Sequence, residues 1–85
     1  MQNQYYRTRD LGEAGSLIVS GMSMIEIERE HTTCWFVFKN GEECQKLSQE
    51  YFFGNLGVNA RELYEALTRL KNRIFSNNGY GNKRS

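Results

Sequence analysis

Three scarcities limit what this chain can be. Its 85 residues include one histidine and two cysteines, which are too few for a four-ligand zinc site made of Cys and His alone or for a disulfide-rich secreted scaffold. No apolar run reaches about 18 residues, so we expect no membrane span. The formal net charge is only +1, which excludes a uniformly basic coat for nucleic acid. The length allows one small domain, for which we expect neither a metal nor a cofactor.

The cysteines and the first residues bear on the compartment. The chain opens without a basic segment followed by an apolar one, so we expect no secretory signal. Cys34 falls in a strand-like run and Cys44 on the apolar side of a predicted helix, where both would act as small buried hydrophobes. A Cys34–Cys44 disulfide stays open, because it needs the two Cα atoms within about 7 Å. We expect reduced thiols and a cytoplasmic protein.

Apolar and aromatic residues are plentiful enough for a folded core. The hydrophobic share is 39%, and the chain has five Phe, five Tyr and one Trp, which argues against intrinsic disorder. Residues 5–8 favour a strand. Asp10 then predicts an N-cap with Glu13 as its capping-box partner, and apolar spacing predicts a helix over about 11–20. Gly12 and Gly15 weaken this helix, so either packing must compensate or the glycines let another backbone come close.

Alternation along residues 24–29 predicts a half-buried strand. Ile25 and Ile27 fall on one face and should pack against the core, whereas Met24 and the glutamates fall on the wet face. A short polar turn leads to the apolar run 34–38, whose β-branched and aromatic residues favour a second strand. Two strands joined by a short link predict an antiparallel hairpin.

Two helices follow the hairpin. The spacing of apolar residues predicts the first over 42–53. The second begins after the N-cap Asn59 and runs to about Phe75. Glu65 and Arg69 on this helix have the i,i+4 spacing of an ion pair.

The predicted order is strand, helix, strand, strand, helix, helix. We therefore expect an α+β domain over residues 1–75, with helices on one face of a small antiparallel or mixed sheet. Residues 76–85 are rich in Asn and Gly and predict a disordered polar and basic tail.

A set of short segments carries a likeness to known proteins. They are residues 6–11, 25–29, 36–38, 58–63, 66–67 and 70–71. In their spacing and hydrophobic pattern they resemble a family of short uncharacterised proteins of bacteria and archaea, often of phages and mobile elements. The resemblance covers residue 6 to about 75 and transfers no catalytic residue. It implies an accessory protein of a virus or mobile element, and an oligomer.

No catalytic arrangement is visible in the sequence. His31 is the only histidine, and a nucleophile pair with Cys34 would need an orienting third group and an oxyanion loop that the sequence does not offer. We interpret His31 as a solvated turn residue. Alternating glutamates could bind a hard cation, but ordinary wet strand faces have the same pattern. We expect a protein that is not an enzyme.

The charges are unevenly distributed along the chain. Residues 11–38 hold four carboxylates and one arginine, a net −3, while residues 61–85 hold six cations and two carboxylates, a net +4. We interpret the cations of the late helix, the tail and the first strand as a patch for weak, salt-sensitive nucleic-acid binding. The patch comprises Arg7, Arg9, Arg69, Lys71, Arg73, Lys83 and Arg84.

Two alternatives remain beside nucleic-acid binding. Glu26, Glu28 and Glu30 could imitate nucleic-acid charge and block a basic cleft of a host defence protein, or both charged faces could simply be solvated. Phe52 and Phe53 fall on different sides of their helix, so one of them should be exposed. Because a core of this size is marginal alone, we expect a homodimer with Phe53 at a partner interface.

Overall fold

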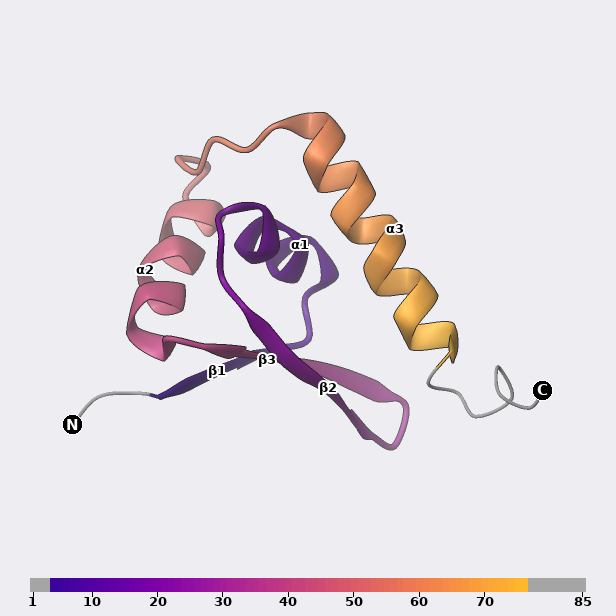
Figure 1. Cartoon of the computed structure of the whole chain (residues 1–85). Helices are drawn as coiled ribbons and strands as arrows, with labels where there is room; N and C mark the ends of the chain where they lie inside the picture. The colour runs from indigo at the N-terminus through magenta and orange to yellow at the C-terminus, as the bar shows by residue number, and fades with distance from the viewer. Residues whose placement is uncertain (1–3, 77–85) are drawn as a thin grey trace.

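Figure 1 shows a computed structural model of the chain, which describes residues 4–76. The elements in order are β1 (Tyr5–Thr8), α1 (Leu11–Val19), β2 (Met24–Glu30), β3 (Thr33–Lys39), α2 (Gly41–Phe52) and α3 (Ala60–Ser76). The α+β class and the predicted order are confirmed. The predicted tail, with Lys83 and Arg84, lies outside the described residues except for Ser76, which ends α3.

The sheet has β3 at its centre, with the strand order β1-β3-β2 and both pairings antiparallel. All three helices lie on one side of the sheet in Figure 1. On that side α1 and α2 contact the sheet, whereas α3 packs mainly against α1. The opposite face, which we call the outer face, carries no covering element among residues 4–76.

The core lies between the sheet and the helices. Its fully buried side chains come from every layer: Phe36 and Phe38 from β3, Leu17 from α1, Cys44 from α2 and Leu70 from α3. Burying a large apolar side chain contributes about 2–3 kcal/mol. The central strand and the facing helix stripes therefore supply most of the energy that holds the layers together.

A β-bulge changes which residues of β2 face the core. Met24 pairs with Phe38 and Glu26 pairs with Val37, so Ile25 is an extra residue between two ladder positions. Met24 consequently packs against the core and Ile25 turns to the outer face, where it is 42% exposed. The prediction that Ile25 and Ile27 share one packed face was wrong, because a bulge breaks the period-two alternation.

The helix starts follow the sequence signals. Asp10 Oδ1 accepts a hydrogen bond from the Glu13 amide at 2.8 Å, and Asn59 Oδ1 accepts one from the Glu62 amide at 3.0 Å. Both predicted N-caps are confirmed. The reciprocal half of the first capping box was wrong, since the Asp10 amide donates to Thr8 Oγ1 at 3.1 Å and the Glu13 carboxylate turns into the core.

Side chains, and not another backbone, approach the two glycines of α1. A Cβ at Gly12 would lie 2.6 Å from the Tyr51 hydroxyl, and one at Gly15 would lie 2.8 Å from Leu67 Cδ2. The predicted close approach exists, but its partners are a tyrosine of α2 and a leucine of α3. Gly15 thereby sets how closely α1 and α3 pack.

Candidate functional site

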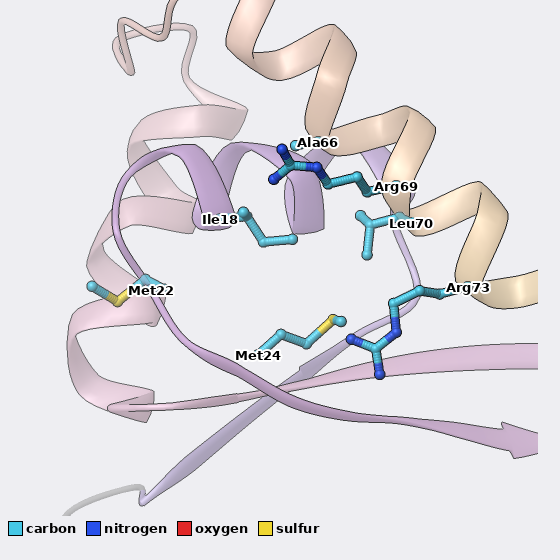
Figure 2. A pocket seen from close by; sticks show the side chains of 7 residues that line it. All are labelled: Ile18, Met22, Met24, Ala66, Arg69, Leu70 and Arg73. Atoms are coloured by element: carbon cyan, nitrogen blue, oxygen red, sulfur yellow. The ribbon is translucent and has the colours of Figure 1, made fainter.

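A shallow pocket opens between α1, β2 and α3. It measures about 210 Å³, and its apolar walls are Ile18, Met22, Met24, Ala66 and Leu70. Figure 2 shows the side chains of Arg69 and Arg73 reaching from α3 over this pocket. We call the pocket with these two arginines the α3 groove.

The two arginines of the groove are one helical turn apart and both are exposed. Neither forms a salt bridge with any residue in the described part of the chain. The predicted Glu65–Arg69 pair was wrong, because the Glu65 carboxylate lies 4.0 Å from Arg61 instead. Two like charges at i,i+4 repel by a few tenths of a kcal/mol. An anion between them would remove that cost.

The structure separates the other predicted cations from the groove. Lys71 is two residues from each arginine, about 200° around the helix axis, and so points away from both. Arg7 lies on the outer face, with its guanidinium carbon 4.6 Å from the centroid of the Trp35 ring. Arg9 follows β1; its guanidinium carbon is 5.9 Å from the same centroid, and it also lines a hollow with Leu11 and Ile74. The five members of the predicted patch that lie within residues 4–76 therefore do not form one patch, and Lys83 and Arg84 lie outside the described residues.

The outer face carries charges of both signs around a tryptophan. Arg7 Nη2 lies 3.1 Å from Glu28 Oε1, so the pair spans the central strand. The Trp35 indole nitrogen donates to Glu30 Oε1 at 3.0 Å. Glu26 is exposed and has no salt bridge within residues 4–76. Two of the three predicted partner-binding glutamates are therefore engaged by their own chain.

Both phenylalanines at the end of α2 are exposed. The exposed fractions are 61% for Phe52 and 77% for Phe53, so the structure exposes both side chains where we expected one to be exposed. Phe53 is the C-cap residue that follows α2, and its amide donates to the Gln49 carbonyl. Its ring can point to solvent because the chain turns there.

A buried carboxylate is the main feature that the sequence reading missed. Glu13 is 2% exposed, and its carboxylate accepts hydrogen bonds from three hydroxyl groups. Tyr6 donates at 2.5 Å, Thr8 donates at 2.6 Å, and Ser48 also donates to it. These bonds join α1 to β1 and α2. Tyr6 and Thr8 are two residues apart on β1 and therefore share one face of the strand, so the sequence could have indicated that both hydroxyls point inward. No sequence signal indicates that Ser48 lies close to Glu13.

The ionisable groups near Glu13 are held in their neutral forms. Burial, then hydrogen bonding to Glu13, raises the pKa of Tyr6 above its ordinary value. Burial, followed by the Glu13 and Glu43 charges, raises the pKa of Cys44 to about 11. Both cysteines are free, so no Cys34–Cys44 disulfide is present. A thiol with this pKa is almost wholly protonated at neutral pH and is a poor nucleophile.

Two further findings concern metals and membranes. Within residues 4–76, no group of three His, Cys, Asp or Glu side chains is placed to hold a metal ion. None of the helices described there is long and apolar enough to cross a membrane.

Comparison with known proteins assigns the chain to one family. No curated protein and no solved structure matches the chain. A family model described as a domain of unknown function, DUF5659, matches residues 3–76. This match confirms that the chain resembles uncharacterised proteins over nearly its whole length, while an origin in phages or mobile elements stays a prediction. The chain belongs to the DUF5659 family.

Proposed function

We propose that the domain is a non-enzymatic binding module that holds nucleic acid weakly through Arg69 and Arg73 in the α3 groove. One observation carries the proposal: two exposed guanidinium groups, one turn apart, have no acidic partner within residues 4–76. A backbone phosphate is the ligand that such a pair favours, because guanidinium binds phosphate with paired, charge-assisted hydrogen bonds.

The groove gives these arginines an apolar base. Both side chains line the pocket together with Met24 and Leu70, and arginines on such apolar surfaces pack their aliphatic stems while the charged ends stay available to a ligand. Guanidinium contacts of this kind fix position on a nucleic acid without reading its sequence. Binding should therefore be weak, tolerant of sequence and sensitive to salt.

The proposal is narrower than the predicted patch. Lys71 points away from the groove, and Arg7 faces Glu28 across the sheet. Both would add to the general field around the protein without contacting the same phosphates. Arg69 and Arg73 are therefore the residues whose loss should matter most.

The test is a salt titration of binding to labelled single- and double-stranded oligonucleotides, followed by fluorescence anisotropy. We expect micromolar affinity at low salt that weakens steeply as salt rises. The double variant Arg69→Ala/Arg73→Ala should bind about tenfold more weakly, with a log–log salt slope lower by about 2.

A matched control removes the same charge elsewhere. Lys46 of α2 and Arg61 of α3 are exposed and lie outside the groove, so Lys46→Ala/Arg61→Ala should keep most of the affinity. Equal losses in the two double variants would mean that only net charge matters. Absence of binding to either oligonucleotide at low salt would exclude the proposal.

A protein partner is the second candidate, and the exposed pair Phe52 and Phe53 supports it. Aromatic side chains are enriched at the centres of protein interfaces. Such a partner could be a host defence protein. Its binding should be lost on Phe53→Asp and kept on Arg69→Ala, the reverse of the result expected for nucleic acid.

The cellular setting is also part of the proposal. A cytoplasmic accessory role in a virus or mobile element is consistent with the family resemblance and with two free thiols. The genes beside this one test it: integrase, capsid or replication genes would support the role, and a stable chromosomal neighbourhood would contradict it.

A further inference from the structure

The outer face of the sheet is ordered in rows across the three strands. Arg7 of β1 pairs with Val37 of β3, which pairs with Glu26 of β2. In the next row Arg9 lies beside the Trp35 ring, and Trp35 pairs with Glu28. These two rows therefore have the order cation, apolar residue, anion, whereas Tyr5 pairs with Lys39 in the row before them.

This face also exposes apolar side chains. Tyr5 is 58% exposed, and the bulge places Ile25 on the same side with 42% exposure. Together with Val37 and charged neighbours they line a depression of about 330 Å³. A bulge that turns an isoleucine out of the core is a feature that often serves a surface role.

We propose that the outer face docks a second copy of this chain, with a two-fold axis parallel to β3. Rotation about that axis places each row of one copy opposite the same row of the other copy. The order of the strands is reversed, so β1 faces the partner's β2. Arg7 then faces the partner's Glu26, Arg9 faces the partner's Glu28, and the partly exposed Trp35 side chains of the two copies meet near the axis. Such an isologous contact pairs one patch with itself.

Charge order selects a second copy over other occupants. A nucleic acid would meet the glutamates of both rows, Glu26 and Glu28, and be repelled. Arg9 and Glu26 have no salt-bridge partner within residues 4–76, so both gain a partner in the dimer. Arg7 keeps Glu28 of its own chain at 3.1 Å and gains a second carboxylate.

The contact should be weak. The seven-residue strands β2 and β3 are about 23 Å long and the four-residue β1 about 13 Å, so at a spacing of about 4.8 Å the three strands span roughly 300 Å². Stable interfaces bury about 800 Å² per partner. We therefore expect a concentration-dependent dimer with micromolar or weaker affinity. It leaves the α3 groove free, because the helices lie on the other side of the sheet (Figure 1).

The test is sedimentation velocity over a concentration series that reaches the millimolar range. The wild-type chain should shift from monomer to dimer, and emission of Trp35, the single tryptophan, should move to shorter wavelength along the same curve. Arg7→Glu or Glu26→Lys alone should remove dimerisation, and an equimolar mixture of the two should restore it as a heterodimer, since each altered residue then faces an opposite charge.

Control variants distinguish this dimer contact from other ways in which the chain could associate. Lys46→Glu and Glu50→Lys make the same charge changes on the exposed surface of α2 and should leave the dimer intact. Ile25→Lys should weaken it at least tenfold, which tests the face independently if the Arg7 variant does not fold. A wild-type chain that stays monomeric, a mixture that does not associate, or a dimer abolished by Phe53→Asp would overturn the proposal.

Discussion

The Thr8 hydroxyl donates a hydrogen bond to the Glu13 carboxylate at 2.6 Å, inside the core. Tyr6 and Ser48 donate to the same carboxylate. A single side chain therefore satisfies three hydroxyl groups from two other elements. Thr8 and Ser48 are buried, so without Glu13 their hydroxyl protons would lack an acceptor, which costs about 1–3 kcal/mol per group.

Replacing Glu13 should destabilise the fold in two steps. Glu13→Gln keeps one acceptor oxygen and should lower the free energy of unfolding by about 1–2 kcal/mol. Glu13→Ala keeps none and should lower it by about 3 kcal/mol or more. Urea denaturation measures both, with the exposed Glu50→Gln as control. Equal stability of Glu13→Gln and the wild type would mean that the charge of this carboxylate contributes nothing.

Alkaline pH should weaken the fold through Cys44 and Tyr6. The pKa of Cys44 rises from 9.0 to about 11 in the folded protein, mainly by burial, and that of Tyr6 rises above 10.0 for the same first cause. A folded-state pKa above the unfolded value contributes stability at low pH that is lost as pH rises. Stability should therefore be flat near neutrality, decline from about pH 9 and fall further through pH 11.

Denaturation of two variants checks this assignment. Cys44→Ala should lower stability overall and also reduce the loss between pH 9 and pH 11. Cys34→Ala, which removes the partly buried thiol of β3, is the matched control variant. A Cys44→Ala protein with an unchanged alkaline slope would show that this thiol does not contribute.

The sequence predicted the elements well because their signals are local. N-caps such as Asp10 and Asn59 need only the residues of the next turn, and β3 is a continuous apolar run. The bulge at Ile25 was missed because alternation cannot indicate an extra residue. The Glu13–Ser48 bond joins positions 35 apart, and the row order of the outer face requires the pairing of three strands. Both depend on tertiary structure.

Gly15 should not tolerate a larger side chain. A Cβ there would lie 2.8 Å from Leu67 Cδ2 and 3.1 Å from Leu63 Cδ1. Gly15→Val should therefore lower the free energy of unfolding by about 2–3 kcal/mol through overpacking between α1 and α3. Gly57→Val, at a loop position with open space around it, should change stability by less than about 0.5 kcal/mol.

The double variant Gly15→Val/Leu67→Ala isolates the cause. Removing the leucine makes room for the valine, so the combined loss should be smaller than the sum of the two single losses by about 1 kcal/mol. Additive losses would indicate that Gly15→Val acts through the backbone of α1 and not through its contact with α3.

Two buried serines should respond in opposite directions to the same change. Ser16 in α1 is 1% exposed, and its hydroxyl has no hydrogen-bond partner within residues 4–76. Ser48 in α2 is 3% exposed and donates to Glu13.

Ser16→Ala removes a desolvated, unpaired hydroxyl and improves helix propensity, so it should raise the free energy of unfolding by about 1 kcal/mol. Ser48→Ala leaves the carboxylate short of a donor and should lower it by about 1–2 kcal/mol. Thermal and urea denaturation measure both variants, and a loss of stability in Ser16→Ala would mean that its hydroxyl has a partner, such as a buried water.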